Sequence, residues 1–157
     1  ELDLETDIES DSASLNFLIA EMLDEAANLA ALDQIHVLRD PTRGGIASSL
    51  NEIAKASNVG IRIYDEKVPV PNIVRGACEM LGLDPFYVAN EGKLLAILPK
   101  EYAEKVLEKM RQNEFGQKAE IIGEIVAEHP KMLVAKTAFG STRVVDLQLG
   151  EQLPRIC

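Results

Sequence analysis

Several features that would assign this sequence to a particular class of protein are missing from it. It has no tryptophan and only 4% aromatic residues against 46% hydrophobic ones, so its core must consist mainly of Leu, Ile, Val and Ala. No apolar run approaches the roughly 18 residues of a membrane-spanning helix, and we expect no membrane association. Two cysteines, Cys78 and Cys157, are too few for a disulfide framework or a zinc site, and His36 and His129 lack ligand spacing. We therefore expect no metal site in this chain.

Positive charge is also scarce. There are 16 Lys and Arg residues against 26 Asp and Glu residues, which gives a formal net charge of −10. A protein that binds nucleic acid needs a basic surface for the phosphates, so we expect no nucleic-acid partner. The first ten residues are acidic and lack the basic and apolar regions of a signal peptide, which favours a cytoplasmic location. Because the sequence begins with Glu1 rather than Met, we expect it to be part of a longer protein.

The 157 residues are enough for one domain with a substantial core. Apolar residues that recur every three or four positions predict helices at residues 13–31, 46–57, 73–81 and 100–112. Shorter extended runs predict strands at residues 35–38, 59–64, 94–98, 119–127, 132–135 and 143–147, and residues 86–88 are predicted to be a short extended segment. We predict an α+β domain over residues 1–149, with helices layered on a mixed β-sheet, and a tail at 150–157. Asp11 or Ser12 is predicted to cap the first helix, and Asn72 the third.

The first segment with chemical interest is the turn Arg-Asp-Pro-Thr-Arg-Gly-Gly at residues 39–45. Helical spacing resumes directly after Gly44 and Gly45, so these glycines are predicted to open a helix. Such a start leaves backbone N–H groups available to an anion and lets a ligand approach the backbone closely. A carboxylate, a hydroxyl and a cation lie beside it, from Asp40, Thr42 and Arg43. From the residues alone, a tight turn without a ligand is the alternative.

The second segment is Ala-Asn-Glu-Gly-Lys at residues 89–93, directly before a predicted strand. A turn at the entry of a strand is a good place for a positioned carboxylate, here Glu91. A solvated hairpin turn is the alternative that the residues leave open.

The last segment is the tail, which ends in a thiol on the final residue, Cys157. Pro154 stiffens the tail and favours an extended conformation, in which Arg155 and Cys157 share a face. A guanidinium there would partly offset the terminal carboxylate, whose charge disfavours a thiolate. The pattern indicates a reactive group on a movable arm, although a cysteine at a chance chain end would look the same. Cys78, by contrast, lies among apolar neighbours and is predicted to be a core residue.

Taken together, four segments resemble the HypE family of hydrogenase maturation factors: residues 39–45, 89–93, 137–143 and the closing Pro-Arg-Ile-Cys of 154–157. The resemblance runs from end to end of the chain, but it covers only the C-terminal domain of that family. This is the second domain of the aminoimidazole-ribonucleotide-synthetase-like superfamily. The closing tetrapeptide is highly specific, whereas the Asp-x-Thr-x-Gly-Gly loop is shared more widely in the superfamily.

The resemblance implies a reaction and its partners. In that family the terminal cysteine receives a carbamoyl group from the carbamoyltransferase HypF, and ATP drives dehydration of the S-carboxamide to a thiocyanate. The cyano group then passes to iron on a HypC–HypD scaffold for nickel–iron hydrogenase. Carried over by position, Cys157 is the acceptor and Glu91 is the carboxylate that helps to remove the amide proton. The loop from Asp40 to Gly45 would face the nucleotide cleft between domains.

The same resemblance sets limits. The family's N-terminal domain, which holds most of the Mg-ATP ligands and the dimer-forming barrel, is absent from this chain. We therefore expect a homodimer only in the full-length protein, and no ATP turnover by this part alone. Two other hypotheses stay open: a binding module whose tail docks a partner, and a redox or metal-delivery tail.

Overall fold

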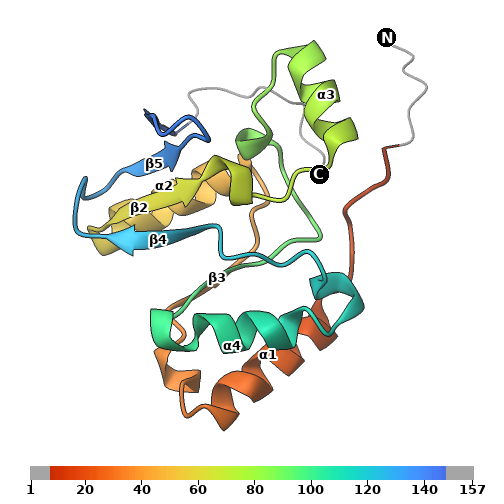
Figure 1. Ribbon diagram of the computed structural model, residues 1–157, viewed down its shortest axis with the longest axis vertical. Helices are drawn as coiled ribbons and strands as arrows, with labels where there is room; N and C mark the ends of the chain where they lie inside the picture. The colour runs from red at the N-terminus through yellow and green to blue at the C-terminus, as the bar shows by residue number, and fades with distance from the viewer. Residues whose placement is uncertain (1–7, 148–157) are drawn as a thin grey trace.

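The computed structural model describes residues 8–147 and shows helices and strands in alternation (Figure 1). The helices are α1 (Asn16–Asn28), α2 (Gly45–Ser57), α3 (Asn72–Leu81) and α4 (Lys100–Met110). The strands are β1 (Val37–Arg39), β2 (Gly60–Tyr64), β3 (Leu95–Ile97), β4 (Gly123–Val126), β5 (Leu133–Lys136) and β6 (Thr142–Val144). The predicted α+β class is confirmed. No helix within residues 8–147 is long and apolar enough to cross a membrane.

A four-stranded sheet in the order β4-β2-β5-β6 carries most of the core. β2 and β5 run parallel, with Ile61 opposite Leu133, and the two outer pairs are antiparallel. Helix α2 packs against β2 and β5 (Figure 1) and shares an apolar cluster with them that includes Leu50, Ala54 and Ile63. Burial of these aliphatic side chains is the main driving force that holds the helix on the sheet. The predicted mixed sheet beneath a helix is confirmed.

Two strands lie apart from this sheet. β1 and β3 form an antiparallel ribbon of their own, with Val37 opposite Ile97. Figure 1 shows α1 and α4 side by side at the far end of the molecule from α3. Each helix of this pair buries one apolar face, the residues being Leu18, Met22 and Ala26 in α1 and Val106 and Leu107 in α4. Their spacing of three and four positions is the pattern that predicted both helices.

Helix α1 begins at Asn16, three residues later than predicted, and no side chain caps it, so the predicted caps Asp11 and Ser12 are wrong. The cause is a close contact with another part of the chain. A Cβ on Gly92 would collide with the carbonyl oxygen of Asp11. The Asp11 carboxylate also lies 3.5 Å from Lys93 Nζ. The chain before α1 is therefore held against residues 91–93 and is not available for a helical turn.

Two short segments also differ from the prediction. Asn72 is the first residue of α3 rather than its cap, and its side chain makes no capping bond. Residues 86–88 are predicted to be extended, but Pro85–Tyr87 form a 3-10 turn, η3. The carboxylate of Asp84 causes this, because its Oδ1 accepts a hydrogen bond from the N–H of Phe86 at 3.0 Å.

Candidate functional site

The loop Asp40–Gly45, called the glycine loop below, joins β1 to the first turn of α2. Gly44 and Gly45 have positive φ angles of 73° and 60°. A Cβ on Gly44 would collide with the side chain of Ser48, and one on Gly45 would collide with the backbone oxygen of Phe86. Glycine is therefore needed at both positions, for the conformation and for the space. The prediction that these glycines open a helix is confirmed.

The start of α2 leaves two backbone amides without an acceptor among residues 8–147. The N–H of Ser48 makes the first hydrogen bond of the helix, to the carbonyl oxygen of Gly44 at 3.0 Å. The N–H groups of Ile46 and Ala47 precede it and donate to no described residue, and no side chain caps the helix. Amides at a helix start carry partial positive charge and favour an anion. The glycine loop can thus offer an anion backbone hydrogen bonds.

The polar side chains of the glycine loop are accessible. Asp40 and Arg43 are exposed, and Thr42 is half-buried. None of these three side chains forms a hydrogen bond or an ion pair with another residue between 8 and 147. The neighbouring Arg39, in contrast, is paired with Glu52 at 2.9 Å. The carboxylate, hydroxyl and cation that the sequence singled out therefore remain available to a ligand.

The turn Asn90–Lys93, called the Glu91 turn below, lies against the glycine loop. The N–H of Asn90 donates to the carbonyl oxygen of Pro41 at 3.0 Å. The side-chain amide of Asn90 donates to the carbonyl oxygen of Val88 at 2.7 Å, which fixes the approach to the turn. Glu91 follows directly; it is exposed and has no hydrogen-bond or ion-pair partner within the described part of the chain. The structure thus brings together two of the three predicted segments, although they lie far apart in sequence.

An arginine that sequence reasoning left without a role stands beside this pair of turns. Arg143 on β6 contacts the carboxylates of Asp84 and Asp65, at 2.8 and 3.5 Å. Its guanidinium lies 4.9 Å from the centre of the Phe86 ring. Burial lowers the pKa of Arg143, but the two carboxylates outweigh this and raise it, so the side chain stays charged. The only signal in the sequence is that Arg143 belongs to the segment 137–143 that carries the family resemblance.

The chain that leads to the tail is held at three points. The N–H of Val145 donates to the carbonyl oxygen of Leu133 at 2.9 Å. The carbonyl oxygen of Val145 accepts a hydrogen bond from the buried side chain of Asn51 at 2.8 Å. The hydroxyl of Tyr87 donates to the carbonyl oxygen of Asp146 at 2.9 Å. Because Tyr87 belongs to η3, the tail departs from a point fixed to the segment that precedes the Glu91 turn.

The two cysteines differ in what can be said of them. Cys78 on α3 is only 6% exposed, which confirms its prediction as a core residue. Burial, and after it the charge of Asp84, raise the pKa of its thiol, so Cys78 is protonated and unreactive at neutral pH. Cys157 lies outside the residues that the structure describes, as does the whole of the predicted tail.

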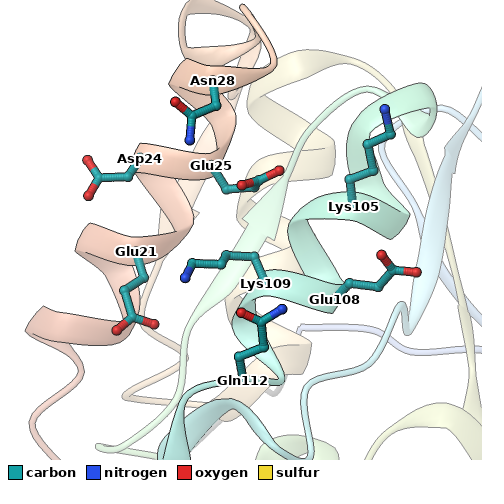
Figure 2. Close-up of a pocket in the computed structure, with 8 residues that line it drawn as sticks. All are labelled: Glu21, Asp24, Glu25, Asn28, Lys105, Glu108, Lys109 and Gln112. Atoms are coloured by element: carbon teal, nitrogen blue, oxygen red, sulfur yellow. The ribbon is translucent and has the colours of Figure 1, made fainter.

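One hollow in the described surface lies elsewhere, in the gap between α1 and α4. It has a volume of about 590 Å³ and is lined by charged and amide side chains, from Glu21, Asp24, Glu25, Asn28, Lys105, Glu108, Lys109 and Gln112 (Figure 2). It contains no residue of the glycine loop or the Glu91 turn. No group of three or more His, Cys, Asp or Glu side chains within residues 8–147 could hold a metal ion.

The family profile described as AIR synthase related protein, C-terminal domain, matches residues 3–135. The chain belongs to this family. The matched residues include the four helices, strands β1 to β4 and most of β5.

Several similar proteins are named for hydrogenase maturation or for carbamoyl dehydration. The carbamoyl dehydratase HypE of Azotobacter vinelandii is 52% identical over 99% of this chain and 44% of its own length. A crystal structure of the hydrogenase maturation protein HypE in complex with ATP superposes with a TM-score of 0.86, at 44% identity over 99% of this chain and 46% of that one. A crystal structure of a HypE–HypF complex gives a TM-score of 0.84, at 46% identity over 94% of this chain and 46% of that one. The chain thus spans somewhat less than half the length of these relatives.

Proposed function

We propose that this chain is the C-terminal part of an ATP-dependent carbamoyl dehydratase that makes the cyanide ligand of nickel–iron hydrogenase. The similarity to HypE over nearly all of the chain supports this proposal. The observation that carries it is the hydrogen bond between Asn90 and Pro41, at 3.0 Å, which holds the Glu91 turn beside the glycine loop. A carboxylate and an anion-binding helix start then lie next to each other. This is the pair of groups that the removal of water with ATP requires.

In the first step of the proposed reaction, the thiolate of Cys157 attacks the carbonyl carbon of a carbamoyl donor bound to HypF. A carbon–sulfur bond forms, the donor's leaving group departs with its electron pair, and an S-carboxamide remains on Cys157. The thiolate serves as the nucleophile here and afterwards as the tether.

In the second step the S-carboxamide loses the elements of water. An amide oxygen is a poor leaving group, so the terminal phosphoryl group of ATP is transferred to it and ADP departs. The carbamoyl nitrogen loses its first proton to solvent as the phosphoryl group is transferred, and Glu91 accepts its second proton. The carbon–oxygen bond breaks, phosphate leaves with its electron pair, and a thiocyanate remains on Cys157. The cyano group is then transferred to iron on the HypC–HypD complex.

The glycine loop is the part of this chain that we assign to the nucleotide. The amides of Ile46 and Ala47 can receive a phosphate oxygen, and Arg43 can pair with its charge. Thr42 supplies a hydroxyl, and Asp40 is a single carboxylate that can reach a Mg²⁺ ion carried by the nucleotide. We assign most of the Mg-ATP ligands, and the contacts of a homodimer, to an N-terminal domain of the full-length cytoplasmic protein.

The length of chain that ends in the tail fits a carrier. Ten residues follow Leu147, and an extended chain of that length spans at most about 33–36 Å. Just before these ten residues, Asp146 is bonded to Tyr87, which lies four positions before Glu91. From that point, Cys157 can return to Glu91 or extend towards a second protein. One thiol can therefore serve a donor enzyme, the ATP site and an acceptor complex in turn.

The test is the intact mass of the full-length protein after incubation with HypF, carbamoyl phosphate and ATP. We expect a carbamoyl adduct that loses one water only when ATP is present. Cys157→Ser should never gain the adduct, whereas Cys78→Ala, the matched control at the buried cysteine, should behave as the unchanged protein. If HypF is shown to be active but the unchanged protein gains no carbamoyl group, the proposal fails and the tail is only a docking element.

A further inference from the structure

Arg143, Asp84, Asp65 and Phe86 form a compact group, called the Arg143 cluster below, that the proposed reaction does not use. The guanidinium contacts Asp84 at 2.8 Å and Asp65 at 3.5 Å, and it lies 4.9 Å from the centre of the Phe86 ring. Asp84 Oδ1 also accepts a hydrogen bond from the backbone N–H of Phe86, at a distance of 3.0 Å. The cluster therefore ties strand β6 to Asp84, which caps the η3 turn, and to Phe86 within that turn.

The η3 turn in turn sets the position of the glycine loop. The backbone oxygen of Phe86 lies so close to Gly45 that a Cβ there would collide with it, and Val88 O would be 2.6 Å away. The chain then continues to Asn90, whose N–H is bonded to Pro41. A displacement of η3 must therefore move the glycine loop, the Glu91 turn, or both.

The chemistry of the cluster suits arginine and no other residue. A guanidinium is planar and carries several donors in one fork, so it can bond two carboxylates and stack on a ring at the same time. An ammonium group is a point charge and cannot hold this arrangement. Arg143 is also two residues before Val145, so it lies close to the point at which the chain that leads to the tail is hydrogen-bonded to the core.

We propose that Arg143 is a positioning residue for the removal of water: through Asp84 and Phe86 it fixes η3, and η3 fixes Glu91 relative to the glycine loop. This assignment rests on the proposed function. If Arg143 holds Glu91 in place, its loss should slow the chemical step, because a catalytic group that is displaced by about 1 Å can lose about 10²-fold in rate.

The experiment compares Arg143→Gln, Arg143→Lys and Asp84→Asn in the full-length protein that carries a carbamoyl group on Cys157. The rate of water loss is followed by intact mass over a range of ATP concentrations, which separates kcat from KM. Arg62→Gln is the matched control, because Arg62 is also half-buried on a strand and also contacts two carboxylates, Glu124 at 3.2 Å and Glu128 at 3.9 Å. Urea unfolding establishes that each variant is folded.

We expect Arg143→Gln to lower kcat by about 10- to 100-fold and to change the KM for ATP by less than about 3-fold, and Arg143→Lys not to restore kcat. The double variant with Asp84→Asn should be no slower than the slower single variant, because both act through one contact. Arg62→Gln should keep the rate of the unchanged protein. The assignment is overturned if the folded Arg143 variants keep kcat, or if they and Arg62→Gln lose it equally. If the unchanged protein itself loses no water, the proposed function and the role of Arg143 both fail.

Discussion

The backbone N–H of Asn90 donates to the carbonyl oxygen of Pro41 at 3.0 Å, and this single bond joins the two segments that supply the candidate site. Pro41 is fully buried, so its carbonyl group is held rigidly by the packing around it. The neighbours of these two residues, Asp40 and Glu91, are exposed. A buried contact thus positions two accessible carboxylates, an arrangement that suits a site for a charged ligand.

Glu91→Gln should separate the two steps of the proposed reaction. The amide keeps the size of the side chain but cannot accept the proton, so water loss should slow by about 10²- to 10⁴-fold. Carbamoylation of Cys157 should proceed at the normal rate, because that step does not need Glu91. Intact mass with and without ATP measures both steps, and Glu108→Gln on the exposed face of α4 is the control. Equal rates of water loss in both variants would remove Glu91 from the mechanism.

Gly45→Ala should destabilise the fold by about 2–3 kcal/mol. The added Cβ collides with the η3 backbone, and the φ angle of 60° is unfavourable for alanine. Gly76→Ala is the matched control, because Gly76 lies within α3 and a Cβ added to it would meet no atom within 4 Å. That change should stabilise the protein by about 0.5–1 kcal/mol through better helix propensity. Urea unfolding measures the change in the free energy of unfolding for both variants. A change of the same sign in both would contradict this account of the glycine loop.

Asn51→Ala should destabilise the protein by about 1–3 kcal/mol, because it leaves a buried carbonyl group without a donor. Asn51 is 2% exposed and donates to the carbonyl oxygens of Ala47 and Val145 at 2.9 and 2.8 Å. Asn72→Ala, at an exposed asparagine without a capping bond, should change the free energy of unfolding little. Hydrogen exchange should also show faster opening of the backbone near Val145 in Asn51→Ala. A variant as stable as the unchanged chain would mean that Asn51 does not hold the start of the tail.

Tyr64 and Glu124 should give stability a bell-shaped dependence on pH. The hydroxyl of Tyr64 donates to Glu124 Oε1 at 2.7 Å. This bond, helped by Arg62, lowers the pKa of Glu124, and the same bond with burial raises the pKa of Tyr64. The lowered pKa of Glu124 stabilises the fold at pH values above the ordinary carboxyl pKa. This stabilisation is lost as the pH falls through the pKa that Glu124 has in the folded protein. The raised pKa of Tyr64 stabilises the fold at pH values below the ordinary tyrosine pKa. This stabilisation is lost as the pH rises through the pKa that Tyr64 has in the folded protein.

Tyr64→Phe tests this dependence. The variant should be less stable near neutral pH by no more than about 1 kcal/mol, because the pair is largely solvated and screened. The difference should shrink towards about pH 3 and about pH 11, beyond the ordinary pKa values of the two groups. Urea unfolding at the three pH values measures it, with Tyr102→Phe on α4 as the control. A difference that stays constant across the range would show that the hydroxyl acts without the charge of Glu124.

Local rules predicted much of the fold. Helical spacing located the four helices, and Asn58 and Gly82 take the left-handed conformation with which Asn and Gly commonly end a helix, here α2 and α3. The rules failed where distant contacts decide the outcome. Asp11 could not cap α1 because Gly92 holds it, and Asp84 turned a segment of extended character into η3. Strands β4 and β6 are shorter than the apolar runs that predicted them, since pairing depends on the neighbouring strand.

The candidate site was predictable only in part. The glycine loop and Glu91 carry recognisable residue types in recognisable turns, and the structure places these two segments together. Arg143 could not be assigned a role from the sequence, because its role depends on contacts with Asp65 and Asp84. These two residues are remote from Arg143 in sequence and adjacent to it only in the folded structure. The role of Cys157 stays a prediction, since the tail lies outside the described residues.

The hydrogen bond between Asn51 and Val145 joins residues 94 positions apart, and this has a consequence for biosynthesis. A ribosome makes the chain from its first residue, so Asn51, Asp84 and Tyr87 are synthesised long before their partners on and after β6. Until Val145 and Asp146 emerge, α2 has a buried amide without its second acceptor and η3 lacks Arg143. The contacts of Asn51 and Tyr87 with the chain after β6, and that of Asp84 with Arg143, can therefore form only when synthesis has reached Asp146.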